Sequence, residues 1–167
     1  MKIKAGKNPP KDINVFIEIP RGSTIKYELD KESGLIKVDR FLHGAMYFPF
    51  NYGFVPETHA EDGDPLDVVV IASYPVQSGA MLPSRPIGLL EMEDEAGIDT
   101  KIIAVPQDTI DPDYSHVKDI KDLPDHLKAK IKNFFDRYKD LEKGKWVKTN
   151  NFLGVKEAYK AITKALQ

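Results

Sequence analysis

Three aspartates stand within six residues in Asp62–Asp67, a segment with the sequence DGDPLD that leads directly into the apolar run Val68–Ile71. Two ionised carboxylates about 4 Å apart repel each other by roughly 4 kcal/mol at an effective dielectric near 20, so a tight turn that gathers three of them needs cations nearby. Carboxylate oxygens suit hard ions, Mg²⁺ or Mn²⁺ before Zn²⁺. The segment therefore predicts a metal site. A solvated acidic turn of the same composition is the alternative on this hexapeptide alone.

A second acidic group lies in Glu93–Lys101, whose sequence EDEAGIDTK turns at its glycine. Taken alone, this segment is typical of a solvated hairpin turn. Its possible partners are cationic and aromatic, namely Lys26, Arg40 and the pair Tyr138-Lys139. Each partner also has an ordinary explanation, because surface ion pairs are common and a tyrosine on an apolar helical stripe usually packs in the core.

The composition fits one domain spanning residues 1–167. A chain of this length buries about 70% of its unfolded surface and needs no disulfide or metal to hold its core. Lys and Arg number 24 against 26 Asp and Glu, which gives a formal charge of −2 and indicates no nucleic-acid or anionic-membrane partner. The sequence contains no cysteine, which excludes disulfides, thiolate metal sites and cysteine nucleophiles.

Targeting signals are not apparent in the sequence. Met1–Lys11 is basic and interrupted by proline, and no run of about 18 apolar residues occurs. We therefore expect a cytoplasmic protein without a membrane partner.

Two kinds of periodicity divide the chain near residue 110. Before it, short apolar runs bounded by Gly, Pro and Asp predict strands at Asn14–Ile19, Thr24–Leu29, Leu35–Arg40, Leu66–Ala72, Ile87–Met92 and Lys101–Val105. After it, apolar residues spaced by three and four behind Pro124 predict a helix that ends before Gly144, and a second, shorter helix is expected near Lys156–Leu166. Strands followed by helices favour a small antiparallel sheet or barrel with helices packed outside, so we predict a compact β-barrel with two flanking helices.

Alternation along the strands predicts which side chains share a surface. Lys26 and Glu28 are expected to face together, and Glu18 is expected to point away from Ile17 and Ile19. These acids and this cation could then reach the same space.

The chain resembles, almost from end to end, the soluble Mg²⁺-dependent inorganic pyrophosphatases of the bacterial type (family I). The resemblance rests on the segments Ile17–Pro20 (IEIP), Ile25–Glu28 (IKYE), Val38–Arg40 (VDR), Asn51–Gly53 (NYG), Asp62–Asp67 (DGDPLD), Asp94–Gly97 (DEAG) with Asp99 and Lys101, and Phe134–Glu142 (FFDRYKDLE). The DGDPLD segment matches the signature of this family and is highly specific in this setting. The resemblance implies a mainly β (α+β) fold, a small five-stranded OB-like β-barrel with two flanking C-terminal helices. It also implies hydrolysis of inorganic pyrophosphate to two orthophosphates by a metal-activated water, without a covalent intermediate.

The resemblance implies several Mg²⁺ ions in each active site, with Mn²⁺ as a possible substitute. Asp62, Asp67 and Asp99 match the ligands of the tightest ion, and Asp67 also reaches a second ion, so that the two share a water molecule. Further ligands are implied at Asp94, which serves an ion brought by the substrate, at Glu18, and at Glu28, which acts through water.

The remaining roles concern the proton and the phosphates. Asp64 matches the acidic group beside the shared water and is our choice of general base. The phosphate-binding groups match Lys26, Arg40, Tyr138 and Lys139, while Lys101 and Tyr52 line the site and orient the aspartates and the water. Family members of this type are commonly homohexamers, so self-association is expected.

One position departs from the family. Phe48 stands before the proline where the family commonly has tyrosine, and Tyr47 comes one residue earlier. Adjacent side chains of an extended segment point to opposite faces, so Tyr47 is not expected to replace the missing hydroxyl. We expect activity with a modest loss of affinity for phosphate or metal. The four histidines, His43, His59, His116 and His126, are expected to be structural or surface residues, since a hard oxygen site does not use imidazole.

Two alternatives stay open at this stage. A non-catalytic OB-type barrel that binds nucleic acid is disfavoured by the acidic residues where its basic groove would lie. A hydrolase of an organic or nucleoside diphosphate would keep the enzyme and change its substrate. A comparison of pyrophosphate with ATP separates this alternative from the main prediction.

Overall fold

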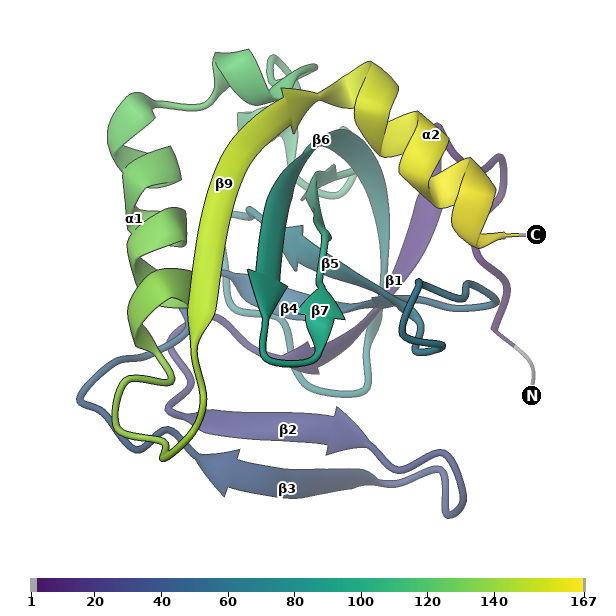
Figure 1. Ribbon diagram of the computed structural model, residues 1–167. Helices are drawn as coiled ribbons and strands as arrows, with labels where there is room; N and C mark the ends of the chain where they lie inside the picture. Colours follow the sequence, from purple (N-terminus) through teal and green to yellow (C-terminus); the bar gives the residue numbers. More distant parts are fainter. Residues whose placement is uncertain (1–2, 167) are drawn as a thin grey trace.

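Five strands close into a ring at the centre of the computed structural model, which describes residues 3–166 (Figure 1). In spatial order they are β1 (Ile13–Ile19), β4 (Asn51–Val55), β5 (Leu66–Val70), β8 (Lys101–Pro106) and β6 (Met81–Asp94), and β6 pairs back onto β1. The ring pairs are antiparallel except for β5 and β8, which run parallel. The mainly β fold is therefore confirmed, and the antiparallel pairing that the pattern favoured holds for every ring pair except β5 with β8.

Further strands extend or flank the ring. The short β7 (Gly97–Ile98) forms a hairpin with the end of β6, and β9 (Val147–Gly154) pairs with the same strand. A separate two-stranded sheet of β2 (Ile25–Leu29) and β3 (Ile36–Phe41) lies below the ring in Figure 1. Residues of this hairpin and of the ring line one pocket.

Two helices flank the strands, as predicted. Helix α1 (Asp125–Arg137) starts directly after Pro124, and α2 (Val155–Ala165) follows β9. Figure 1 shows α1 beside β9 at one side of the molecule and α2 across the top of the ring. Two short 3₁₀ turns, η1 (Pro112–Tyr114) and η2 (Ile120–Asp122), connect β8 to α1. Between residues 3 and 166, no helix has the length and apolar character needed to cross a membrane.

Six predicted strands correspond to β1, β2, β3, β5, β6 and β8. Strand β6 is longer than predicted. Its first residues, Met81–Ser84, pair with β1, and its residues from Ser84 onward pair with β8, β9 and β7. Three strands, β4, the short β7 and β9, were not predicted. Since β9 lies between the two helices, the expectation that only helices follow residue 110 is wrong.

The ring strands are buried on both faces, which explains their continuous apolar runs. Alternate residues of β5 and β8 enter two clusters: Val69 and Ile103 pack with α1, whereas Val68 and Ile102 pack with α2. A sheet covered on both faces loses the usual alternation of apolar and polar residues. This packing on both faces holds the ring strands in place. The polar side chains lie near the ends of these strands.

Candidate active site

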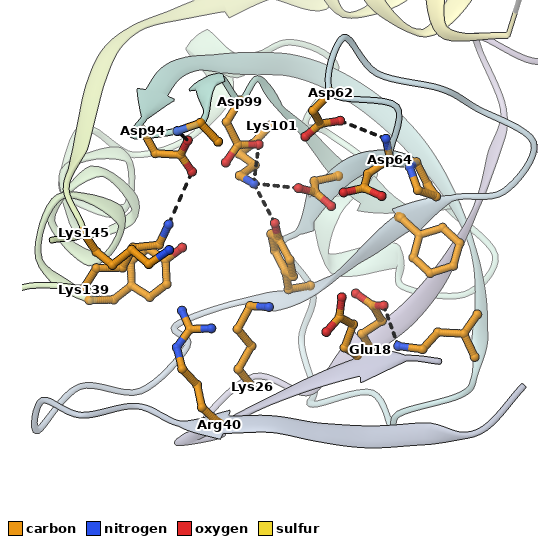
Figure 2. Close-up of a pocket in the computed structure, with 18 of the residues that line it drawn as sticks. Glu18, Lys26, Arg40, Asp62, Asp64, Asp94, Asp99, Lys101, Lys139 and Lys145 are labelled. Carbon is orange, nitrogen blue, oxygen red and sulfur yellow. Dashed lines mark hydrogen bonds and ion pairs between the residues drawn. The ribbon is translucent and has the colours of Figure 1, made fainter. Parts of the chain in front are cut away.

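One pocket between the ring, the β2–β3 hairpin and the end of α1 collects the candidate residues (Figure 2). Its volume is about 300 Å³. Every site residue proposed from the sequence lines it: Glu18, Lys26, Glu28, Arg40, Tyr52, Asp62, Asp64, Asp67, Asp94, Asp99, Lys101, Tyr138 and Lys139. Figure 2 shows Asp62, Asp64, Asp94 and Asp99 along one wall, with Lys26 and Arg40 on the opposite wall. Residues up to about 120 positions apart in the chain thus share one space.

Lys101 is the buried centre of the acidic wall. Its side chain is only 4% exposed, and its ammonium group donates to Asp67 Oδ2 at 2.6 Å and Asp99 Oδ1 at 2.8 Å. A third bond, of 2.8 Å, goes to the hydroxyl of Tyr52. Burial acts to lower the pKa of Lys101, but the charges of Asp67 and Asp99 outweigh burial and raise this pKa well above its usual value. The lysine is therefore a permanent cation that holds two aspartates and one tyrosine together.

The signature turn places its first two aspartates at the pocket mouth. Asp62 Oδ1 accepts the backbone N–H of Asp64 at 2.9 Å, and Gly63 adopts a φ of 85°, a conformation that glycine tolerates without strain. The side chain of Asp64 is 74% exposed and lies 3.3 Å from the ammonium of Lys31. Asp67 follows on β5 and is less exposed than Asp64. The turn therefore presents acids at two depths.

The second acidic segment forms the β6–β7 hairpin and the link to β8. Asp94 Oδ1 accepts the N–H of Ala96, which leaves Oδ2 to contact the ammonium of Lys139 at 3.3 Å. Burial is the main cause that raises the pKa of Asp99, and the nearby Asp67 adds to it, while Lys101 opposes the rise. Asp67 on β5 and Asp99 between β7 and β8 thus repel each other across Lys101.

The opposite wall comes from the β2–β3 hairpin. Lys26 and Arg40 are direct partners in the strand register, so their side chains start side by side. Lys26 pairs with Asp39 at 3.4 Å, not with Glu28. Glu28 also lines the pocket, which fits the predicted shared face of Lys26 and Glu28. The hairpin therefore brings cations toward the acidic wall.

Glu18 projects from β1 at a break in its pairing with β4. The register shifts between the buried residues Ile17 and Ile19, and Glu18 points into the pocket as expected. Its carboxylate accepts the N–H of Leu29 at 2.9 Å. Burial, assisted by the charge of Asp67, raises the pKa of Glu18 to about 7, although the bond from Leu29 opposes the rise. A cation beside the carboxyl of Glu18 would stabilise its ionised form.

An aromatic cluster supports the third side of the pocket. Tyr138 follows the last turn of α1, stacks on Phe134 with 5.0 Å between ring centroids, and is buried except for 8% of its surface. Phe48 is 2% exposed and lies 5.9 Å from Tyr52 and 6.4 Å from Tyr138, again between centroids. Tyr47 is exposed and does not line the pocket, as the alternation predicted.

Three charged lining residues were not proposed from the sequence: Lys31, Glu142 and Lys145. Glu142 is the last residue of the segment Phe134–Glu142, which contributed to the resemblance, but the sequence assigned it no role. Lys145 is held 3.2 Å from Glu95, which itself lies beside Lys139. Among the described residues, the four histidines are absent from the lining.

The acidic wall is not arranged as a completed metal cage. Within residues 3–166, no three His, Asp or Glu side chains converge in a metal-holding group. The ammonium of Lys101 lies between Asp67 and Asp99 instead. All the anionic donors are carboxylate oxygens, and they outnumber the cations of the lining. Such a donor set suits hard divalent ions rather than zinc.

One wall of the pocket carries carboxylates, and the opposite wall carries cationic side chains that can bind phosphate. This arrangement is typical of one class of protein, the hydrolases that act on phosphate compounds with the help of hard metal ions. Comparison with known proteins narrows this class. The sequence matches the inorganic pyrophosphatase family over residues 15–167. It is 58% identical over 162 residues to the inorganic pyrophosphatase of Aquifex pyrophilus, which covers 97% of this chain and 92% of that protein.

Two further relatives agree. The inorganic pyrophosphatase of Escherichia coli K12 is 49% identical over 168 residues, covering 100% of this chain and 96% of that protein. The crystal structure of the inorganic pyrophosphatase from Thermus thermophilus superposes with a TM-score of 0.96 at 44% identity and covers 99% of this chain and 95% of that one. The chain belongs to the inorganic pyrophosphatase family and is an enzyme of that family.

Proposed function

We propose that the pocket hydrolyses inorganic pyrophosphate to two orthophosphates by direct attack of water, with several Mg²⁺ ions and no covalent intermediate. The observation that supports this most directly is the convergence of every predicted acid and cation on a single pocket of about 300 Å³. Family membership supports the same substrate. Pyrophosphate carries three to four negative charges, so an acidic wall excludes it unless cations reverse the local field.

The residues fit Mg²⁺ as the cofactor. Burial, with a smaller contribution from the charge of Asp67, raises the pKa values of Glu18 and Asp99, and a divalent cation beside these carboxyls would stabilise their ionised forms. Asp62, Asp67 and Asp99 would hold the tightest ion, Asp94 and Glu18 would hold others, and Glu28 would act through a water ligand. When bound at these residues, Mg²⁺ would lower the pKa of a water ligand from about 15.7 toward neutrality and would neutralise charge on the reacting phosphate. Mn²⁺ would substitute, since it accepts the same oxygen ligands.

The side chains of the chain itself perform the remaining steps. Asp64 accepts the proton of the attacking water, and its exposed position at the mouth lets that proton leave to solvent. Lys26, Arg40, Tyr138 and Lys139 bind the phosphate oxygens and stabilise the charge that develops on the leaving group. Lys101 and Tyr52 hold Asp67 in place through the bonds described above.

The first test is release of orthophosphate from pyrophosphate with millimolar Mg²⁺, beside a control with excess chelator. We expect fast release that depends on the metal. Asp67→Asn should remove most turnover, about 10²-fold or more, and weaken Mg²⁺ binding, because one charge is lost at nearly constant volume. Asp113→Asn, a substitution outside the pocket, is the matched control. Near-normal turnover of Asp67→Asn at saturating Mg²⁺ would contradict the assignment of this ligand.

Parallel assays address the alternatives. ATP in place of pyrophosphate tests for a nucleoside diphosphate or triphosphate substrate, and we expect slow release. Binding to single-stranded DNA at low salt tests for a nucleic-acid module, which would need a basic groove studded with aromatic residues. The acidic lining of the pocket argues against that module.

We further propose that residues 1–167 form one domain, that the enzyme is cytoplasmic and that it assembles as a homohexamer. The family resemblance supports these three statements. Exposed apolar side chains on and beside the β2–β3 hairpin, Leu35, Val38 and Phe41, offer surface for self-association. Light scattering should give six times the 18.8 kDa of one chain. A monomer at micromolar concentration would contradict the hexamer.

A further inference from the structure

Arg40 lies between two carboxylates that come from different parts of the fold. Its Nη1 group donates to the adjacent Asp39, and its Nε lies 3.0 Å from Glu142 Oε1. Asp39 precedes it on β3, whereas Glu142 belongs to the loop that follows α1. The Glu142 side chain is only 9% exposed, so this ion pair is the most buried contact of Arg40.

Two buried polar atoms of the Arg40–Glu142 ion pair lack a hydrogen-bond partner among residues 3–166. Within the part of the chain that the structure describes, Glu142 Oε2 is buried without a hydrogen-bond donor, and Arg40 Nε lacks an acceptor in good hydrogen-bond geometry despite its 3.0 Å approach to Oε1. A buried carboxylate oxygen without a donor is costly. A small rotation of the guanidinium toward Glu142 would satisfy both atoms, because arginine and carboxylate pair side-on through two parallel N–H···O bonds.

We propose that Glu142 is the positioning residue for Arg40. Its carboxylate fixes one edge of the guanidinium, and a bound phosphate draws Nη1 away from Asp39 while Glu142 completes the two-bond pair. The guanidinium of arginine is planar and carries donors on more than one edge. One edge can therefore bind Glu142 while another edge faces an anion. This inference rests on the proposed role of Arg40 in phosphate binding.

The proposal opposes the simple electrostatic expectation. A carboxylate in the pocket lining repels an anionic substrate, so its removal should strengthen binding if charge alone mattered. If Glu142 positions Arg40, its removal weakens binding instead. The sign of the change in KM therefore separates the two readings.

The experiment measures KM and kcat for Mg²⁺-pyrophosphate in Glu142→Ala, Glu142→Gln, Arg40→Ala and the double variant Arg40→Ala/Glu142→Ala. We expect Glu142→Ala to raise KM about tenfold, the size of one lost charge-assisted hydrogen bond, with a smaller change in kcat. Glu142→Gln should recover most of the loss, because its amide oxygen still accepts from Nε. In the Arg40→Ala background, Glu142→Ala should change KM less than about twofold, since the anchored group has gone.

Glu142→Asp keeps the charge and withdraws the carboxylate by one methylene, so it tests the proposal even if the alanine variant does not fold. It should raise KM several-fold. The matched control is Glu157→Ala, which removes an exposed glutamate that pairs with Lys160 on α2 at 3.0 Å. It should leave both constants unchanged, and thermal melting should show each variant folded.

Three outcomes would overturn the inference, and they are distinguishable. If Arg40→Ala raises KM but Glu142→Ala and Glu142→Asp do not, Glu142 is not a positioning residue, and the phosphate-binding role of Arg40 stands. If Arg40→Ala itself leaves KM unchanged, the proposed role of Arg40 fails and the inference fails with it. A rise in KM of equal size in both backgrounds would also contradict positioning.

Discussion

Single side chains set the charge state of the pocket before any substrate arrives. Lys101 holds Asp67 and Asp99 with short bonds, yet Asp99 and Glu18 still have raised pKa values. Burial is the main cause of both shifts, and the nearby ammonium groups do not offset it. The carboxylates proposed as ligands of a divalent ion repel each other when no ion is present, so we expect the stability of the protein to depend on pH and on metal.

Glu18 gives this sensitivity a definite sign in the metal-free protein. Its pKa is about 7 when folded and about 4.5 when unfolded, so the folded state binds the proton more tightly. The contribution of Glu18 to the free energy of unfolding is therefore fully present below pH 4.5 and is lost as the pH rises through 7. The loss amounts to at most about 3 kcal/mol, at 1.36 kcal/mol for each pKa unit.

Urea unfolding with chelator present, near pH 5 and near pH 8, measures this effect. Glu18→Gln is the control, because it keeps the shape and removes the titration. The difference in unfolding free energy between the two pH values should be smaller in Glu18→Gln. Equal pH dependence in the two proteins would contradict the role of Glu18.

Position 48 lacks the hydroxyl of the tyrosine that the family commonly has there, and a substitution can restore it. Because the Phe48 ring is buried against Tyr52 and Tyr138, which both line the pocket, Phe48→Tyr would add a donor beside the site. We expect KM for pyrophosphate or the Kd for Mg²⁺ to fall about two- to tenfold, the size of one net hydrogen bond. Tyr47→Phe, at an exposed position, should change neither constant. If Phe48→Tyr is inert in both constants, the hydroxyl does not matter at this position.

At the scale of the elements, the site depends on how closely β1 and β4 approach. Gly53 lies on β4 between Tyr52 and Phe54, and a methyl group there would overlap the carbonyl oxygen of Phe16 on β1. Gly53→Ala should therefore separate the two strands and displace Tyr52. We expect a loss of about 3 kcal/mol or more in unfolding free energy, together with lower turnover.

Gly44→Ala is the matched control, because a methyl group there meets no atom within 4 Å. Thermal melting of the two variants makes the comparison, and about 2–4 °C is expected for each kcal/mol in a chain of this size. A Gly53→Ala protein as stable as Gly44→Ala would show that the strands can move apart without cost.

The sequence predicted the elements whose local pattern is strong. The apolar run of β5 and the three-and-four spacing of α1 identify these elements without tertiary information. Strand β4, with the sequence NYGFV, lacks both alternation and a β-branched run, and β9, with the sequence VKTNNFLG, is largely polar and none of its residues is fully buried. The parallel pairing of β5 with β8 depends on how the ring closes, which local periodicity does not contain.

The candidate site could be predicted further than the fold because the resemblance supplied its residues. Their convergence needed the structure, since it depends on the hairpin β2–β3 lying opposite the ring. The burial of Lys101 and the contact of Glu142 with Arg40 could not be read from spacing, because both join segments distant in sequence.

For the whole molecule, the pocket is the place where separate parts of the fold repel each other. Acids from β1, the β4–β5 connection and the β6–β8 connection face one space, and acids outnumber cations in its lining. An ion that bridges these segments favours the folded state over the unfolded chain. Mg²⁺ should therefore stabilise the entire protein rather than one loop.

Mg²⁺ at about 100 times its Kd is expected to add roughly 2.7 kcal/mol to the unfolding free energy. At about 2–4 °C for each kcal/mol, the melting temperature should rise by about 5–10 °C. Calorimetry with and without Mg²⁺, in the absence of pyrophosphate, makes the measurement independent of catalysis. The Asp67→Asn protein should show a smaller rise, because it keeps fewer ligands for the ion.

Ionic strength is the decisive control for this prediction, since any salt screens repulsion among exposed acids. Sodium chloride at the ionic strength of the Mg²⁺ sample should raise the melting temperature by much less, because Asp67, Asp99 and Lys101 are largely shielded from solvent. Equal shifts with the two salts would mean that Mg²⁺ only screens charge. A larger shift with Mg²⁺ that Asp67→Asn reduces would mean that the ion bridges carboxylates from separate strands, as the proposed hydrolysis of pyrophosphate requires.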